Sequence, residues 1–487
     1  MKISLSWLQQ YLKVDLSTDE LSELLTDIGL EVEGIHKYET IKGGLKGIVI
    51  GKILTVDKHP DADRLNLTTV DVGTEDPLQI VCGAPNVAIG LNVPVATVGT
   101  RLYDGDESFK IKRSKIRGQI SNGMICGPDE IGLGPKTDGI MELPDDAEVG
   151  MAGANYFNIN EDIVFEIGLT PNRSDAMSHI GVARDLKAVL NSRGDDLKMC
   201  MPSIKDFKID NKDLTIDVKI ESESLCPRYS GVSISNITVN ESPDWLKHKL
   251  LSIGINPINN IVDVTNYVLH ETGQPLHAFD TEKILGKEII VKTLSNDTNF
   301  ITLDESNRKL SDNDLMICNA KEPMCIAGVF GGLDSGVTKN TNSIFIESAY
   351  FDPTSIRKTA KYHKLNTDAS FRYERGCDPN ITVYALKRAA LLIQELCGGE
   401  ISSDVVDVYP NPIEDFSINF SFNNLNKLIG EELDRNLVKS IIKNLEIKIL
   451  EENDDTLSLL VPPYRTDVRR EVDVIEDILR IYGFNSI

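Results

Sequence analysis

Four carboxylates gather near the end of the chain, in the segment YRTDVRREVDVIEDILRIYGF that runs from Tyr464 to Phe484. Asp473, Glu476 and Asp477 are spaced i, i+3 and i+4, which places them on one face of a helix, and Asp467 precedes that helix. Converging oxygen donors suit a hard cation such as Mg²⁺, so these acids are a candidate metal site. A solvated acidic face near a helix N-terminus, where negative charge is mildly favoured, explains the same spacing.

Two further side chains are candidates for catalysis. Glu347 stands within IFIESAYF, a β-rich run in which a buried acid is costly and therefore indicates function. His277 lies in PLHAF, where a structural histidine is the ordinary alternative to a catalyst. The sequence holds no GxSxG nucleophile elbow, and Cys377 in RGCDP has no histidine near it in sequence, so covalent catalysis is disfavoured. We therefore expect an activated water as the nucleophile.

A third group of candidate residues is basic. The stretch KIKRSKIR places five cations in eight residues of a chain whose formal net charge is −24. Such an acidic chain is not a generic polyanion binder, because non-specific affinity for nucleic acid comes from cations that neutralise phosphates. The stretch is a local candidate for phosphate contact, and a solvated charged strand face is the alternative. Its cations are Lys110, Lys112, Arg113, Lys115 and Arg117.

Length and composition limit the elements that can carry these groups. At 487 residues the chain is too long for one core, and at ~150 residues per domain it predicts three or four domains. No apolar run approaches the roughly 20 residues of a membrane span, and the N-terminus lacks the apolar stretch of a signal peptide, so we expect a cytoplasmic protein with no membrane partner. The eight cysteines form no CxxC pair and have no histidine at ligand spacing, so neither zinc nor a disulfide framework is expected.

Local patterns predict a multidomain α+β fold. Residues 17–34 predict a capped helix, because Ser17 is followed by Glu20 and then by leucines at helical spacing. Short β-rich runs over residues 40–150 predict a small barrel, inserted into a helical and mixed N-terminal domain of residues 1–39 and 151–200. A longer α+β domain covers 208–402, and a small α+β domain, 408–487, follows a Pro-rich acidic linker.

Several motifs in a fixed order carry a resemblance to a known family. KHPDADRLNLTTVDVG, IVCGAPNV and IKRSKIRGQISNGMICG resemble a tRNA-binding barrel of the oligonucleotide-binding (OB) type. They are followed by TNYVLHETGQPLHAFD, GVFGGLDSGVT, IFIESAYFDP, TDASFRYERGCDP and PPYRTDVRREVDVIEDILRIYGF. Over essentially every residue the chain is similar to the β subunits of bacterial phenylalanyl-tRNA synthetases. Such subunits continue with a catalytic-like domain and an anticodon-binding domain, so the resemblance identifies this chain as an N-terminal part.

The resemblance implies an editing site in the central domain that hydrolyses mischarged tyrosyl-tRNA. An apolar pocket for phenylalanine rejects an isostere with an added hydroxyl by only about a hundredfold, so a second, hydrolytic site is expected. Glu347 would accept a hydrogen bond from the tyrosine hydroxyl, and Ala369 would leave room for the ring. His277 would orient the ester and the water together with Thr265 and Asn266. The residues implied are Thr265, Asn266, His277, Gly331, Glu347, Thr367 and Ala369.

The role of one glycine stays open at this point. Gly331 would let the terminal adenosine of the tRNA approach the backbone, but Gly332 is an equal candidate from one sequence. Two other classes of function also remain. The first is a non-catalytic RNA-binding or assembly module with a vestigial pocket. The second is DNA binding, which is the weakest, because the basic pair Arg469 and Arg470 lies amid acids.

The resemblance also implies partners and cofactors. Two α and two β subunits would form a heterotetramer that binds phenylalanine tRNA. By the same resemblance, the α subunit would bind ATP and phenylalanine. This chain itself has no Walker A motif. Mg²⁺ would be shared with the α subunit at Asp467, Asp473, Glu476 and Asp477, with Asp477 standing where glutamate is more usual.

Overall fold

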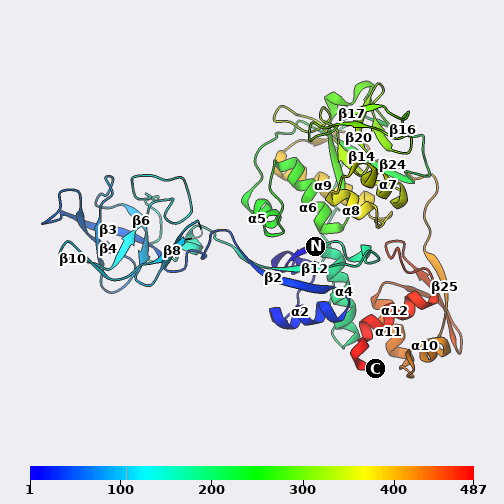
Figure 1. Ribbon diagram of the computed structural model, residues 1–487, viewed down its shortest axis with the longest axis horizontal. Helices are drawn as coiled ribbons and strands as arrows, with labels where there is room; N and C mark the ends of the chain where they lie inside the picture. Colours follow the sequence, from blue (N-terminus) through cyan, green and yellow to red (C-terminus); the bar gives the residue numbers. More distant parts are fainter. Residues whose placement is uncertain (106) are drawn as a thin grey trace. The chain divides into compact units, whose positions relative to one another are not determined.

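The fold is seen in a computed structural model that describes residues 1–105 and 107–487 (Figure 1). The described chain divides into two compact units, one joining Met1–His36 to Ile163–Ile487 and the other formed by Lys37–Asp162. Both helices and antiparallel sheets occur, so the chain is a multidomain α+β protein, as predicted. None of the described helices has the length and the apolar character needed to cross a membrane.

The second unit is built around a five-stranded antiparallel sheet in the order β11-β6-β3-β4-β5. Its last strand is also tied to the segment before β11, because Asn122 N–H donates to Gln79 O at 2.8 Å. Val81 N–H donates in the same place to Ser121 Oγ at 3.1 Å. The sheet is thus nearly closed on itself around an apolar core. Its elements are β3 Ile48–Lys58, β4 Asn66–Asp71, β5 Leu78–Cys82, β6 Asn92–Thr97, β7 Arg101–Asp104, β8 Glu107–Lys110, β9 Ser114–Ile116, β10 Gln119–Ser121, β11 Gly123–Ile125 and α3 Gly153–Tyr156.

The N-terminal part of the first unit is a three-stranded sheet, β1-β12-β2, packed against helices. Helix α2 begins with the predicted capping box, in which Ser17 Oγ accepts from Glu20 N–H and Ser17 N–H donates to the Glu20 carboxylate. The helix ends at Asp27 and not at residue 34, because Gly29 adopts a φ of 80° and the following residues form a strand. The elements are β1 Lys2–Ser4, α1 Leu5–Leu8, α2 Thr18–Asp27, β2 Glu31–Glu39, β12 Glu161–Gly168, η1 Ser174–Ala176 and α4 His179–Ser192.

The central part of the first unit stacks two five-stranded sheets and a helical layer. Strands of the first sheet follow the order β15-β22-β14-β23, with β24 also paired to β14, and the second sheet has the order β13-β16-β19-β20-β21. Ile346 of β22 shares one core with Val264 of α6 and Ala385 of α9. Its neighbour Phe345 shares a different core with Met316 of β19. Because side chains alternate along a strand, α6 and α9 cover one face of the first sheet and the second sheet covers the other.

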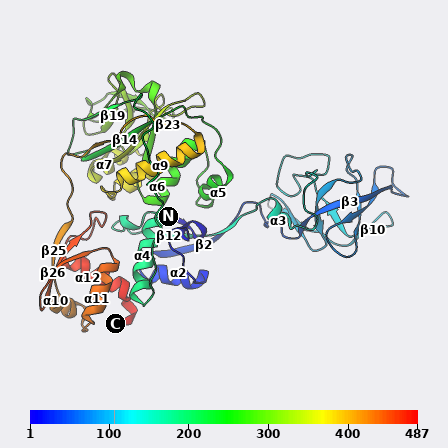
Figure 2. The same cartoon turned by 180° about the vertical axis from the view of Figure 1, so that it is seen from behind.

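Figure 2 shows α6 and α9 side by side, with α9 packed against β14 and α6 against β15. The strands of this part are β13 Asp217–Ile220, β14 Arg228–Ser235, β15 Leu276–Asp280, β16 Glu288–Thr293, β17 Asn299–Ile301, β18 Asn307–Lys309, β19 Leu315–Cys318, β20 Pro323–Ile326, β21 Phe330–Gly331, β22 Ile344–Tyr350, β23 Glu400–Ile401 and β24 Val406–Val408. Its helices are α5 Asp244–Ser252, α6 Asn260–Thr272, η2 Thr281–Lys283, η3 Leu285–Lys287, α7 Pro353–His363, α8 Asp368–Tyr373 and α9 Thr382–Cys397.

The C-terminal part of the first unit is a three-stranded antiparallel sheet, β25-β27-β26, with helices. Two of these helices, α11 and α12, contact α4 of the N-terminal part, so the two ends of the chain meet in one core. The elements are β25 Phe416–Ser421, α10 Phe422–Ile429, α11 Arg435–Asn444, β26 Lys448–Glu452, β27 Thr456–Val461, α12 Glu471–Tyr482 and η4 Phe484–Ser486.

Candidate functional site

His277 and Glu347 face each other across two paired strands. The antiparallel register of β15 and β22 sets His277 opposite Glu347, so both side chains lie on the same face of the first sheet. That face is the one covered by the second sheet, because Phe279 and Phe345, each two residues away along its strand, belong to the core between the sheets. The β-rich runs PLHAF and IFIESAYF thus bring together two groups 70 residues apart in the chain.

Glu347 is buried, with 5% of its surface exposed. The hydroxyl of Tyr229 on β14 donates a hydrogen bond of 2.7 Å to Glu347 Oε2. Burial raises the pKa of Glu347 to about 7, and the hydrogen bond from Tyr229 lowers it only in part. At neutral pH the carboxyl group is therefore divided between its acid and its carboxylate form.

The imidazole of His277 is held edge-on to Phe279, with ring centroids 4.4 Å apart. Burial lowers the pKa of His277 to about 4, so the ring is neutral at pH 7. Its Nε2 is enclosed and has no hydrogen-bond partner among the described residues. A neutral imidazole with a free nitrogen in such a place can accept a hydrogen bond from a water or a substrate.

Gly331, and not Gly332, lies beside this imidazole. A Cβ added at Gly331 would stand 3.4 Å from His277 Cε1, so the glycine leaves that side of the ring open. A Cβ at Gly332 would instead collide with Met324 O at 2.4 Å, within the second sheet. The geometry therefore separates two glycines that the sequence alone leaves equivalent.

Thr367 and Ala369 lie on the same side of the sheet as Glu347. Thr367 caps helix α8, accepting from Ser370 N–H at 3.0 Å and donating to Val329 O at 3.0 Å, two residues before Gly331. Ala369 is partly buried against the core between the sheets. The cap thus ties α8 to the strand that carries Gly331.

Thr265 and Asn266 lie elsewhere. They are in the middle of α6, which covers the opposite face of the first sheet, and Thr265 Oγ1 donates to Val262 O within its own helix at 2.7 Å. The structure therefore does not bring them together with Glu347 and His277 on one face of the sheet. The reason is that VDVTNYV forms a helix under the sheet, although its β-branched residues are equally suited to a strand end.

The five predicted phosphate-contacting cations are exposed on two hairpins of the second unit. Lys110 ends β8, and Lys115 lies in β9 of the following hairpin. Phe109, which precedes the group, is 50% exposed. Exposed cations and an exposed aromatic residue are the residue types that bind single-stranded nucleic acid, through phosphates and base stacking. The exposed cations are Lys110, Lys112, Arg113, Lys115 and Arg117.

The four acids of the predicted metal site do not converge. Asp477 lies on the buried side of α12 and accepts from Arg465 Nη1 and Arg480 Nη2, each at 2.9 Å. Asp473 caps the helix and accepts from Arg470 N–H at 2.8 Å. In the described residues, no three His, Cys, Asp or Glu side chains are grouped to hold a metal ion.

The two remaining acids differ in burial and in their contacts. Asp467 is half-buried and accepts from Asn172 Nδ2 at 3.2 Å, and burial together with the charges of Asp175 and Asp477 raises its pKa to about 6. Glu476 is exposed on the outer side of α12. The prediction that the four carboxylates form one site is therefore wrong in its geometry. Helical spacing does not determine which carboxylate binds arginines and which one caps the helix.

Asp477 belongs to a buried charge cluster that the sequence alone does not predict. The cluster joins η1 and α4 to the C-terminal part, since Asp185 is bound by both Arg173 and Arg480, the latter at 2.9 Å. Arg480 also donates to Ile28 O at 3.0 Å. Three cations and three anions offset one another out of water, as buried charges require. The members of the charge cluster are Arg173, Asp175, Asp185, Arg465, Asp477 and Arg480.

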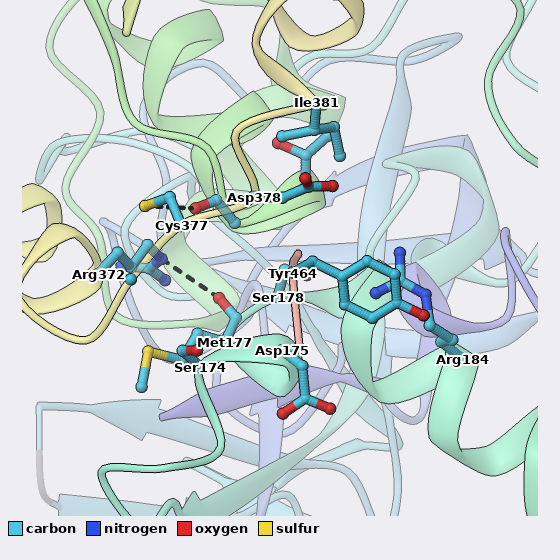
Figure 3. A pocket seen from close by; sticks show the side chains of 13 residues that line it. Ser174, Asp175, Met177, Ser178, Arg184, Arg372, Cys377, Asp378, Ile381 and Tyr464 are labelled. Carbon is cyan, nitrogen blue, oxygen red and sulfur yellow. Dashed lines mark hydrogen bonds between the residues drawn. The ribbon is translucent and has the colours of Figure 1, made fainter. Parts of the chain in front are cut away.

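A small cavity of about 30 Å³ lies where the three parts of the first unit meet. Figure 3 shows Arg372 and Cys377 on one side of it and the ring of Tyr464 in front of Arg184 on the other. Arg372 Nε donates to Met177 O at 3.2 Å, and the Arg184 guanidinium stacks on Tyr464 at 4.0 Å from the ring centroid. The volume is room for only about one or two waters, which is too small for a substrate.

Two sets of residues escaped the sequence reasoning. Tyr229 belongs to no motif, although a buried acid such as Glu347 requires a hydrogen-bond donor, and that requirement was a signal. The arginines that bind Asp477 stand within the same segment as the acids, in YRTDVRREVDVIEDILRIYGF. Their apolar neighbours Val474 and Ile478 mark the side of α12 that is buried.

The chain matches three known domain families. Residues 48–152 match a putative tRNA binding domain, residues 225–398 match the B3/4 domain, and residues 418–484 match the tRNA synthetase B5 domain. Together they cover most of the second unit and most of the central and C-terminal parts of the first.

Several relatives match over the whole chain. Over 487 residues the chain is 55% identical to the phenylalanine–tRNA ligase beta subunit of Bacteroides fragilis strain YCH46, an alignment that covers 100% of this chain and 59% of the relative. It is 56% identical, with the same coverage, to the phenylalanine–tRNA ligase beta subunit of Bacteroides thetaiotaomicron. For the protein of that name in Porphyromonas gingivalis the identity is 54% over 488 residues, again with 100% of this chain and 59% of the relative covered. The chain spans about three fifths of the length of these relatives.

Proposed function

The chain belongs to the phenylalanine–tRNA ligase beta-subunit family, and from that premise we propose that it binds phenylalanine tRNA and hydrolyses tyrosyl-tRNA made in error. The complete enzyme would work in the cytoplasm as two α and two β subunits. The α subunits would bind ATP and phenylalanine and attach the amino acid to tRNA, while this chain scaffolds them and edits the product.

One observation carries the editing proposal, namely the buried carboxyl of Glu347 opposite a neutral His277. A tyrosine side chain can hydrogen-bond to that carboxyl and a phenylalanine side chain cannot. An unmatched buried polar group costs about 1–3 kcal/mol, which favours tyrosine over phenylalanine. This is the discrimination that an apolar synthetic site lacks.

The hydrolytic step follows from the groups around the pair. His277 Nε2 would accept a hydrogen bond from a water and aim its oxygen at the ester carbonyl carbon. The water oxygen bonds to that carbon, the bond from the carbon to the ribose oxygen breaks, and the ribose oxygen takes the proton that the water gives up. Tyrosine then leaves with a free carboxyl group and the tRNA with a free ribose hydroxyl. Cys377 is no competing nucleophile, because burial raises the pKa of its thiol to about 12.

The placement of the other expected residues limits their roles. Gly331 would leave room for the terminal adenosine beside His277. Thr367 would hold α8 against the strand of Gly331, and Ala369 would leave space for the tyrosine ring. Thr265 and Asn266, from beneath the sheet, would support the site through α6 without touching Glu347.

The second unit would hold the tRNA body. We propose that its sheet is a barrel of the OB type inserted in the N-terminal domain, with the exposed cations from Lys110 to Arg117 against phosphates. These contacts are local, so they operate within a chain that is acidic overall.

A magnesium ion does not fit the four predicted acids as a set. The carboxylates of Asp473 and Asp477 are engaged by the helix cap and by the charge cluster. That leaves Asp467 and Glu476, and Mg²⁺ often binds through only one or two carboxylates. A cation shared with the α subunit would draw on those two residues.

A non-catalytic RNA-binding module is the second candidate function. The observation that favours it is the contact of Tyr229 with Glu347, which satisfies the carboxyl without any substrate. The two functions differ in one measurable property, the release of tyrosine from tRNA.

The test follows tyrosine release when the chain is mixed with tyrosine-charged phenylalanine tRNA. We expect release by the parent, about a hundredfold slower release by His277→Ala, and loss of the preference for tyrosine over phenylalanine in Glu347→Ala. The matched control is His363→Ala, which removes a buried histidine bound to Asp314 at 2.7 Å, away from the site. No release above the spontaneous rate, by the chain or by a complete enzyme containing it, would contradict the editing function and leave the RNA-binding module.

A further inference from the structure

Tyr229 and Glu347 form a fully enclosed contact between neighbouring strands. Tyr229 has 0% of its surface exposed, and its hydroxyl lies 2.7 Å from Glu347 Oε2. Glu347 Oε2 is thus occupied by the protein itself, while Oε1 is the oxygen that remains for another donor or acceptor. A carboxyl that is bonded through one oxygen cannot rotate freely, so the direction of the other oxygen is set as well.

The fold builds this contact from strand register. Gly231 stands directly opposite Glu347 on β14, and Tyr229 is two residues along the same strand, on the same face. A Cβ at Gly231 would lie 2.1 Å from Phe345 Cζ, so the ring of Phe345 fills the place of a side chain there. The carboxyl is therefore flanked by His277 from one strand and by Tyr229 from the other.

We propose that Tyr229 is a positioning residue that determines specificity: its hydroxyl holds the Glu347 carboxyl so that Oε1 is presented to the phenol of a misattached tyrosine. The inference rests on the editing function proposed above. It gives Tyr229 no part in the hydrolytic step, since its hydroxyl is engaged by Glu347. Tyr229 acts on the choice between tyrosine and phenylalanine.

Glu347 is the only group in these surroundings, among the described residues, that titrates near neutrality. Burial holds the pKa of each neighbouring thiol and phenol well above its ordinary value, and it lowers the pKa of His277 to about 4. All of these groups are neutral at pH 7, so the protonation of Glu347 changes without a compensating charge. The groups that face Glu347 are Cys226, Tyr229, His277, Cys325 and Tyr373.

The experiment compares Tyr229→Phe with the parent for two substrates, tyrosine-charged and phenylalanine-charged tRNA. The ratio of the two kcat/KM values is expected to fall about fivefold, the effect of one lost hydrogen bond. The inflection that Glu347 gives to the pH profile of tyrosine release is expected to move to higher pH, because the hydrogen bond from Tyr229 lowers the pKa of Glu347. A change in packing alone would move neither quantity.

The matched control is Tyr11→Phe. Tyr11 is a buried tyrosine of the other core of the first unit, and its hydroxyl donates to Glu271 Oε1 at 2.8 Å. Its loss is expected to lower the melting temperature as much as Tyr229→Phe does and to leave the substrate ratio at the parent value.

Three results would overturn the inference. An unchanged ratio with an unchanged pH profile means that Tyr229 is structural only. A ratio that rises means that Tyr229 competes with the substrate for Glu347. A parent that releases no tyrosine removes the editing function itself, and the inference with it. If Tyr229→Phe does not melt cooperatively, the infrared band of the Glu347 carboxyl in the parent tests the proposal instead. This band is identified by its loss in Glu347→Gln, and a frequency typical of a carboxyl without hydrogen bonds would overturn the proposal.

Discussion

Asp477→Ala is expected to destabilise the first unit by ~3–5 kcal/mol, the usual cost of breaking a buried ion pair from one side. Asp477 accepts from both Arg465 and Arg480 at 2.9 Å, and all three side chains are buried. Without the carboxylate of Asp477, the guanidinium groups of Arg465 and Arg480 remain buried but lose one of the anions that neutralise them. Arg480 keeps its contact with Asp185, so the loss is expected at the lower end of that range.

The assay needs a reporter for the part of the chain that holds the cluster. The sequence has two tryptophans, and Trp7 is buried in the core that also contains α4 and α12. Trp245→Phe therefore leaves Trp7 as the single fluorescent probe, and urea unfolding is followed in that background with circular dichroism as a second probe, because a chain of several domains need not unfold in one step. Glu476→Ala is the matched control, since Glu476 is exposed on the same helix and is expected to cost no more than ~0.5 kcal/mol.

Two outcomes would refute this reasoning. Equal losses in Asp477→Ala and Glu476→Ala would mean that the charge cluster does not stabilise the junction. A loss in Asp477→Ala that appears only with added Mg²⁺ would mean that Asp477 is a metal ligand, and that its arginine contacts are secondary.

Three further predictions concern the core and the surface. Glu347→Gln is expected to be more stable than the parent by up to ~3 kcal/mol above pH 7. The pKa of Glu347 is raised from 4.5 to about 7 in the folded parent, so the parent's free energy of unfolding is fully present below pH 4.5 and falls as the pH rises through 7. The unfolding midpoints of the two proteins should therefore agree at pH 4 and differ at pH 8. Gly231→Ala is expected to cost ~1–3 kcal/mol by overlap with Phe345, measured by thermal melting against Gly336→Ala, where a Cβ meets nothing within 4 Å. Replacing the cations of residues 110–117 by glutamine is expected to weaken tRNA binding and to reduce the salt slope by ~0.7–0.9 for each phosphate that is no longer neutralised, in filter binding at several salt concentrations.

Local chemistry was enough to predict the start of α2 and the apolar face of α12. The Ser17 and Glu20 cap follows from side chains within one turn, and the apolar spacing of α12 from its own sequence. Glu347 stood out because an acid within an apolar strand has few explanations other than function. These features depend on neighbours along the chain, so one sequence contains them.

The misplaced residues depend on neighbours across the fold. Helical spacing groups Asp473 with Asp477, but the two carboxylates part because the helix end takes one and the arginines around Asp185 take the other. The position of Thr265 relative to the sheet was not predictable for a similar reason, since only the packing of α6 determines which face of the sheet it lies on. Periodicity tells which residues share a face of an element; the partner of that face comes from tertiary structure.

The contact of Tyr229 with Glu347 marks where this limit lies. The need for a donor beside a buried carboxyl is predictable from the acid alone. Its source is not, because 118 residues separate the two and a shift of β14 by one residue would turn Tyr229 to the helical face. The sequence therefore lacks the register between β14 and β22, and Gly231 is the residue that fixes this register. Only a glycine opposite Glu347 lets the ring of Phe345 occupy that position and lets Tyr229 reach the carboxyl. A chain with a larger residue at 231 would need another donor for Glu347 or would lose the acid.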